Sequence, residues 1–191
     1  SNPVPNPVKV IIPARSLSEL ARIAVDGKES ITMVVPPDRG QAIFHLKNTE
    51  LVTQLIEGNF PDFRAIMPRN FKTRTVISTA EFLKACRQAE IIAREGNHVI
   101  RLNIQPQEGG PGLVEFSTQS EEMGSGEIVV DANIEGPQLL IAFNVRFLAE
   151  VLEVIGAPNT ILETNANNTP GMISPVGDDS FKHVIMPMHL G

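Results

Sequence analysis

The feature that most constrains this chain is a repeated pattern of one helix followed by several strands. Helices are predicted to begin at Ser16, Thr79 and Asn144, which are 63 and 65 residues apart. Ser16 with Glu19, Ser78 with Glu81, and Asn144 are residue types that cap helix N-termini. Apolar residues then recur at helical spacing, and a glycine follows each helix.

Short β-branched runs precede the predicted helices, and segments of strand character follow them. The preceding runs are Val8–Ile12, Thr75–Ile77 and Leu139–Phe143. The strands predicted after the helices are 30–35, 41–45 and 50–56, then 98–104, 113–118 and 127–134, then 160–164, 171–173 and 183–188. The chain is therefore predicted to be α+β, with a βαβββ unit that occurs three times.

An isolated βαβββ unit leaves sheet edges open, so each unit is expected to pair with another. The last two units are predicted to form one complete domain over residues 71–191. The first unit, within residues 1–70, is predicted to be half of a domain, linked through Pro68-Arg69-Asn70. This half could also pair with its copy in a second chain.

Composition limits the classes of function. Apolar residues make up 42% and charged residues 20%, as in ordinary globular proteins, and the net charge of -6 disfavours a surface coated with cations for tight nucleic-acid binding. The single cysteine, Cys86, fits a reducing cytoplasm, so a cytoplasmic location is expected. No apolar run has the length of about 18 residues needed for a membrane span, so no membrane partner is expected.

No pattern in the chain points to catalysis. The P-loop, the dinucleotide-binding fingerprint, G-x-S-x-G and H-E-x-x-H are all absent from the sequence. The four histidines lack metal-ligand spacing, and Cys86 lies on the apolar stripe of a predicted helix. We therefore expect no catalytic residue, no metal and no cofactor; a small hydrolase would need a nucleophile–base pair that the sequence does not reveal.

Four segments carry a family resemblance. Residues 55–68, L-I-E-G-N-F-P-D-F-R-A-I-M-P, resemble the link between the middle and C-terminal domains of bacterial replicative sliding clamps, the DNA polymerase III beta subunit family. Residues 183–190, H-V-I-M-P-M-H-L, resemble the end of that family's chains, and residues 142–145 and 174–180 resemble two further family motifs. The resemblance covers nearly all of this chain, but only the C-terminal half of a family member.

The resemblance implies the DNA-clamp fold and a processivity factor, which is an accessory subunit and not an enzyme. A family member forms a homodimeric ring that encircles duplex DNA without reading its sequence. It tethers the polymerase and the clamp loader through their short linear motifs. The alternative is a peptide-docking module that has the clamp fold but does not encircle DNA.

The resemblance also implies a groove for "Q-L-x-L-F"-like peptides at the end of the chain. An apolar terminal strand could instead simply complete the core, whereas methionines suit a surface that repacks around different ligands. Ala65 and His189 stand where arginines are usual in the family, so peptide preference is expected to differ. The groove residues implied are Pro61, Ile66, Asn144, Phe147, Pro170, Val184, Ile185, Met186, Pro187, Met188 and Leu190.

Two further surfaces are expected. A clamp that slides needs cations that meet phosphates without base contacts, although the same cations could belong to solvated faces balanced by glutamates. The DNA-facing candidates are Arg15, Arg22, Lys84, Arg87 and Arg94. Ile91 and Ile92 match the family's ring-closing contact, but at least one of them could be buried beneath the neighbouring strands.

Overall fold

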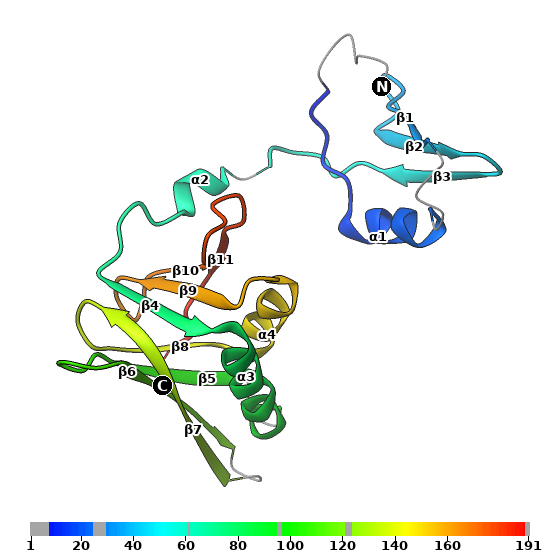
Figure 1. Ribbon diagram of the computed structural model, residues 1–191. Coiled ribbons are helices and arrows are strands. Elements are labelled where there is room, and N and C mark those ends of the chain that lie inside the picture. Colours follow the sequence, from blue (N-terminus) through cyan, green and yellow to red (C-terminus); the bar gives the residue numbers. More distant parts are fainter. Residues whose placement is uncertain (1–7, 25–29, 61, 95–96, 121–123, 190–191) are drawn as a thin grey trace. The chain divides into compact units, whose positions relative to one another are not determined.

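The computed structural model describes residues 8–24, 30–60, 62–94, 97–120 and 124–189. The chain divides into two compact units, Ser1–Asp62 and Phe63–Gly191 (Figure 1). The first unit holds helix α1 and a three-stranded antiparallel sheet in the order β1-β2-β3. Its elements are α1 (Ala14–Ile23), β1 (Thr32–Val34), β2 (Gln41–Leu46) and β3 (Thr49–Gln54).

The second unit holds two long helices, one short helix and eight strands within its described residues. Its helices are α2 (Phe63–Ile66), α3 (Thr79–Ala93) and α4 (Val145–Val154). Its strands are β4 (Thr73–Ser78), β5 (Val99–Gln105), β6 (Gly112–Ser120), β7 (Gly124–Glu135), β8 (Leu139–Asn144), β9 (Asn159–Thr164), β10 (Gly171–Pro175) and β11 (His183–Ile185).

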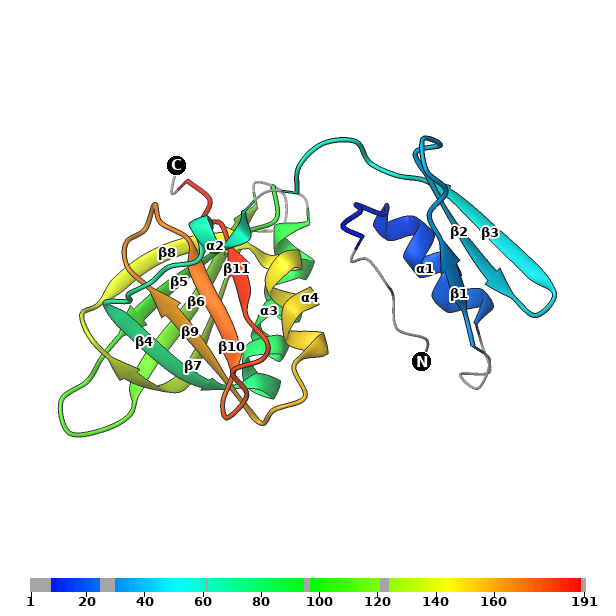
Figure 2. The ribbon, with the colours of Figure 1, turned by 90° about the horizontal axis from the view of Figure 1, so that it is seen from above.

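These eight strands form one antiparallel sheet in the order β11-β10-β9-β4-β7-β6-β5-β8. The two βαβββ repeats are joined through their first strands: β4 pairs with β9 of the second repeat as well as with β7 of its own, and β8 pairs with β5 of the first repeat. The edge strands β8 and β11 are brought together by Met188, whose amide donates to the Ala142 carbonyl at 2.8 Å. The sheet is therefore nearly closed, like a barrel, around α3 and α4, which lie side by side in both ribbon views (Figures 1 and 2).

Alternation along the strands explains how this sheet forms. In β4 and β5, buried and half-buried residues alternate, which places one row of apolar side chains against the helices. From α3, the buried stripe includes Phe82, Cys86 and Ala89 at helical spacing. The Phe82 ring packs against Phe116 of β6 with ring centroids 5.3 Å apart. Full burial of a side chain such as Phe116 stabilises the fold by about 1.5–3 kcal/mol.

Both long helices begin as the sequence predicts. The Ser78 side chain accepts a hydrogen bond from the Glu81 amide at 3.4 Å, and the Asn144 side chain accepts one from the Arg146 amide at 3.0 Å. These caps satisfy amides that have no partner within the first turn. They also fix where β4 and β8 end, because each strand leads directly into its helix.

The prediction for the first helix was wrong in its cap and in the strand before it. Helix α1 begins at Ala14 after Pro13, and no side chain caps it; the Ser16 hydroxyl instead meets the Thr53 hydroxyl at 2.7 Å. Residues Val8–Ile12 form no strand, although the Ile56 amide donates to the Ile11 carbonyl at 2.9 Å. A β-branched run becomes a strand only when it pairs with a neighbouring strand, and among the described residues the Ile56–Ile11 bond is the backbone bond that this run makes to the rest of the first unit.

The other predicted strands form, with shifted ends. Strand β11 stops at Ile185 instead of continuing to Met188, because the chain leaves β10 there and crosses toward β8. The short helix α2 was not predicted; it lies within residues 55–68, the segment that resembles the family's linker. In the described part of the chain, no helix has the length and apolar character to cross a membrane.

Candidate functional site

The end of the second unit contains an open cavity of about 450 Å³. It lies between helix α4 and the segment that includes β11. The described residues that line it are Asn144, Phe147, Glu150, His183, Val184, Ile185, Met186, Pro187 and Met188. Seven of the residues that the family resemblance assigned to a peptide groove therefore lie together around one cavity.

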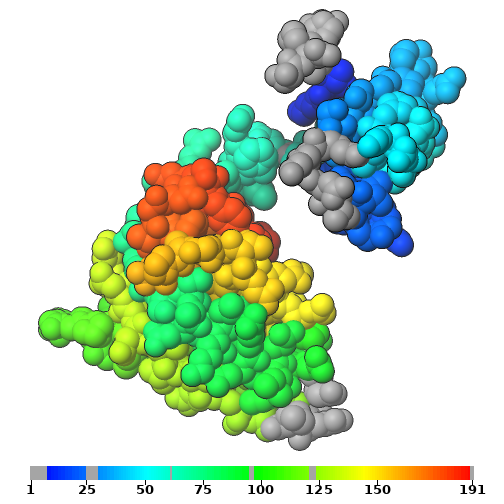
Figure 3. All heavy atoms as spheres, turned by 45° about the vertical axis from the view of Figure 1, so that its right-hand side comes forward, coloured from blue at the N-terminus to red at the C-terminus, as the bar shows by residue number. Residues whose placement is uncertain are grey.

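The cavity forms at the seam of the sheet, which is the place where the edge strands β8 and β11 meet. Between Ile185, the last residue of β11, and Met188, which bridges to β8, the chain crosses from one edge strand to the other. Pro187 has no amide hydrogen and cannot extend a ladder at this point. Met186 and Pro187 therefore leave the sheet opposite the start of α4. In Figure 3 the last residues of the chain (red) border those of β9 and α4 (orange and yellow).

The side chains around the seam divide between the core and the surface. Ile185 is 3% exposed and belongs to the core cluster, as expected if the strand completes the core. Met186 is 62% exposed and Phe147 is 54% exposed, so two large apolar side chains face solvent across the same cavity. An open cavity with exposed apolar walls can receive apolar side chains of a ligand.

Two polar residues that the sequence analysis did not assign also line the cavity, Glu150 and His183. Glu150 follows Phe147 by three residues on α4, so helical spacing could have identified it. Burial lowers the pKa of the His183 imidazole, and the nearby Glu150 carboxylate opposes this effect. The imidazole is therefore neutral at neutral pH, which leaves Glu150 as the charged side chain among the described lining residues.

Two of the four remaining groove candidates, Ile66 and Pro170, do not line this cavity. Ile66 is an exposed residue of α2, and Pro170 is a half-buried residue that precedes β10. Neither is among the lining residues, and each belongs to a segment other than α4 and the chain end. Pro61 and Leu190 lie outside the described residues.

The five DNA-facing candidates occur on two helices, one in each unit, and all are exposed. Arg15 and Arg22 lie on α1, where the Arg22 guanidinium donates from Nε to the Glu19 carboxylate at 3.0 Å. Lys84 and Arg87 lie on α3, with Arg94 directly after its last residue. Two of the five cations are thus paired with carboxylates, since Arg87 Nη2 also donates to Glu153 Oε1 at 3.2 Å.

The two isoleucines proposed for the ring contact differ in burial. Ile91 is 66% exposed and borders a cavity of about 380 Å³ on α3, which Lys84 and Arg87 also line. Ile92 is half-buried over β7: a Cβ atom at Gly126 would lie 2.5 Å from its Cδ1. Residues 124–131 of β7 pair with β6 on one side and with no described strand on the other.

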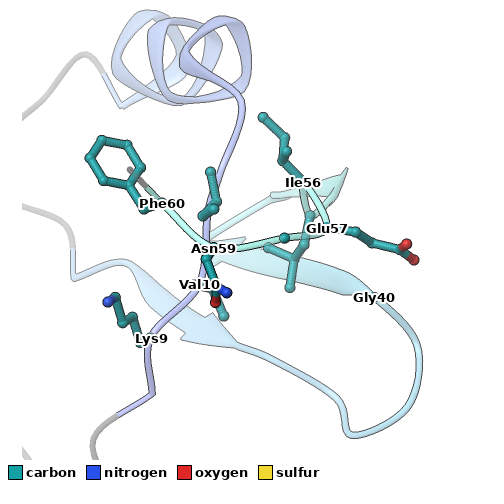
Figure 4. A pocket seen from close by; sticks show the side chains of 10 residues that line it. Lys9, Val10, Gly40, Ile56, Glu57, Asn59 and Phe60 are labelled. Atoms are coloured by element: carbon teal, nitrogen blue, oxygen red, sulfur yellow. The ribbon is translucent and has the colours of Figure 1, made fainter. Parts of the chain in front are cut away.

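The described residues contain no group of three His, Cys, Asp or Glu side chains placed to hold a metal ion. Cys86 is buried, and burial raises the pKa of its thiol far above the ordinary value, with a smaller effect from Glu90. A separate cavity of about 290 Å³ in the first unit includes Lys9 and Val10 from the segment before α1. Figure 4 shows these beside Ile56, Glu57 and Phe60 of the linker motif.

Comparison with known proteins identifies the family. Residues 64–189 match the model of the DNA polymerase III beta subunit, C-terminal domain, and residues 2–62 match that of its central domain. A beta sliding clamp from Staphylococcus aureus is 34% identical over 181 residues, which is 94% of this chain and 46% of that relative. The chain therefore spans about half the length of the curated relatives it matches.

Solved structures agree with the sequence comparison. The DNA polymerase sliding clamp from Bacillus subtilis is 29% identical, with a TM-score of 0.84 over 99% of this chain and 49% of that one. The clamp from Pseudomonas aeruginosa crystallised with a ligand is 25% identical, with a TM-score of 0.84 over 98% of this chain and 50% of that one. These matches confirm the DNA-clamp fold and the family resemblance, and the chain belongs to the DNA polymerase III beta subunit family of sliding clamps.

Proposed function

We propose that the chain is the C-terminal half of a sliding-clamp processivity factor. In this role it encircles duplex DNA as part of a homodimeric ring and tethers the polymerase and the clamp loader by their short linear motifs. It acts as an accessory subunit in the cytoplasm and not as an enzyme. Residues 1–70 supply half of the middle domain, and residues 71–191 supply the third domain.

The observation that carries the proposal is the cavity between α4 and the chain end. Phe147 and Met186 are exposed apolar side chains that can anchor a peptide. Ile185 also lines the cavity, and its buried side chain packs in the hydrophobic core. Asn144 keeps its side-chain oxygen on the Arg146 amide, which fixes the start of α4 beside the cavity. A preformed site of this kind costs little ordering when a short apolar motif binds.

Contact with DNA is proposed to be weak and independent of sequence. Lys84 and Arg94 have no ion pair among the described residues, whereas Arg22 and Arg87 share their charge with Glu19 and Glu153. Partly neutralised cations hold phosphates loosely, which permits sliding. Exposed Ile91 on α3, and residues 124–131 of β7, which pair with no described strand on one side, support an interface with another protomer.

The net charge of -6 and the paired arginines favour one alternative, a docking module that binds peptides without encircling DNA. The two functions differ in their behaviour on circular DNA. A ring stays on closed circular DNA and slides off after the DNA is cut, whereas a docking module is not retained on either form. A clamp of full family length that carries this chain as its C-terminal half, loaded onto circular DNA by a clamp loader, distinguishes the two.

The peptide site can be tested by NMR on this chain. A Q-L-x-L-F peptide is added to the ¹⁵N-labelled protein, with a control peptide in which Leu and Phe are replaced by Ala. The expected shift changes are concentrated in residues 144–150 and 183–188 and are absent with the control peptide. Changes spread over the whole chain, or equal changes with both peptides, would refute the site.

A further inference from the structure

The cavity at the chain end combines apolar walls with one acidic side chain. Of the described residues that line it, Asn144, Val184, Ile185, Pro187 and Met188 are uncharged. Phe147 and Met186 supply exposed apolar surface, and Glu150 lies one turn after Phe147 on α4. No lysine or arginine is among these lining residues. A ligand that fills the apolar part therefore meets a carboxylate at its border.

The charged groups nearest to Glu150 on α4 and on the facing segment form no ion pair with it among the described residues. Arg146 lies one turn earlier on α4 and is exposed, but no ion pair joins it to Glu150 among the described residues. Glu153, one turn later, is paired with Arg87. On the facing segment, His183 is held neutral by burial at neutral pH, and Lys182 is exposed outside the lining residues. Glu150 is therefore the charged side chain among the described residues that line the cavity.

We infer that Glu150 makes this groove select peptides that carry a lysine or arginine beside their apolar anchors. This inference rests on the proposed peptide-binding function and adds the chemistry of the partner. A cation beside the anchors gains attraction from the carboxylate at the edge of an apolar surface, where the effective dielectric constant is below that of water. An acidic residue in the same place is repelled.

Acid should weaken this selection. As the pH falls, His183 takes up a proton and places a positive charge on the segment that lines the cavity with Glu150. Arg146 on α4 and Lys182 next to His183 are exposed and lie outside the lining residues. The preference for a cationic peptide is therefore expected to be stronger at neutral pH than in mild acid.

The test compares labelled Q-L-x-L-F peptides that differ in one charge. Lys or Glu is placed before the motif, at its third position, or after it, and affinity for the 191-residue chain is measured by fluorescence anisotropy. At the most sensitive position, the Lys peptide is expected to bind about three- to tenfold more tightly than the Glu peptide at low ionic strength. The ratio should shrink as salt is raised.

Two variants locate the effect. Glu150→Gln keeps the shape of the side chain and should bring the Lys/Glu ratio to about one. Glu153→Gln removes a carboxylate from the same helix but outside the cavity lining, and should leave the ratio as in the unchanged protein. A ratio that persists in Glu150→Gln, or the absence of a Lys preference at all positions, would overturn the inference while peptide binding stands. Failure of every peptide to bind would overturn both the inference and the proposed function.

Discussion

At the scale of single residues, the environment of each titratable group decides its role. His183 and Cys86 both have pKa values shifted by burial, in opposite directions, because burial disfavours a charged imidazolium and a charged thiolate alike. Asp178 has a lowered pKa for a different reason: the Ser180 hydroxyl and amide both donate to its carboxylate. The sequence predicted no catalytic role for these residues, and burial or hydrogen bonding accounts for the direction of each pKa shift.

His183 should make the second unit less stable in mild acid. Above a pH of about 6.5 the imidazole is neutral in both the folded and the unfolded chain. As the pH falls below that value, the imidazole of the unfolded chain takes up a proton before that of the folded chain, so the free energy of unfolding decreases. The decrease ends once the pH is below the pKa of His183 in the folded chain. Urea unfolding of the protein and of His183→Gln at several pH values tests this. The same decline between pH 7 and pH 5 in both proteins would contradict the account.

Cys86 should be inert in the folded protein. Its thiolate is strongly disfavoured by burial, and the side chain has no solvent access. A thiol-reactive chromogenic reagent is therefore expected to react only at the rate of unfolding in native buffer, and at once in concentrated urea. Rapid reaction in native buffer would show that α3 opens or that the thiol is exposed.

At the scale of elements, the caps and the alternation of apolar residues were readable from the sequence. The starts of α3 and α4 were predicted because local side chains determine them, through Ser78 and Asn144. The Ser16 cap failed because the Ser16 hydroxyl pairs with Thr53, a contact between residues distant in sequence. The pairing of β4 and β8 with strands of the other repeat was not predicted for the same reason, since strand order depends on contacts that no local pattern encodes.

Asn144→Ala should destabilise the second unit by about 1 kcal/mol, through loss of the cap on α4. Ser78→Ala removes a longer hydrogen bond, 3.4 Å against 3.0 Å, and is expected to cost less. Chemical denaturation of both variants measures the difference in the free energy of unfolding. A larger loss for Ser78→Ala than for Asn144→Ala would contradict this order.

The groove candidates were identified by resemblance, and seven of them line one cavity. Glu150 and His183 were not predicted, because the family motifs indicate the apolar anchors and not the polar residues that border them. Ile66 and Pro170 were included by resemblance but belong to other segments of the second unit. The sequence motifs thus named residues that share one cavity, and the three-dimensional packing determines which of the described candidates line it.

At the scale of the whole molecule, the two units differ in the size of their cores. In the second unit, both repeats share one sheet and enclose a cluster of buried apolar residues from α3, α4 and the strands. In the first unit, Ala42, Phe44 and Thr53 are the buried residues among those described, and α1 has no buried side chain. The core of the second unit is enclosed by two repeats, whereas the first unit consists of a single repeat.

Hydrogen exchange should reveal this difference. The amides of β2 and β3 are expected to exchange through local opening, whereas those of β5, β6 and β8 exchange only in global unfolding of the second unit. Peptide-level mass spectrometry after a series of exchange times measures both. Equal protection in the two units would mean that the first is stabilised by contacts beyond its own small core, such as pairing with a second copy.

The central claim is that the cavity at the chain end binds a short apolar peptide. The most direct measurement is an anisotropy titration of a labelled Q-L-x-L-F peptide with the unchanged chain, with Met186→Ala, and with Met33→Ala. Met33 is also an exposed methionine, on β1 of the first unit, and serves as the matched control. The account predicts that Met186→Ala weakens binding about fivefold or more, while Met33→Ala has no effect. Equal affinity of all three proteins, or no binding by the unchanged chain, would contradict it.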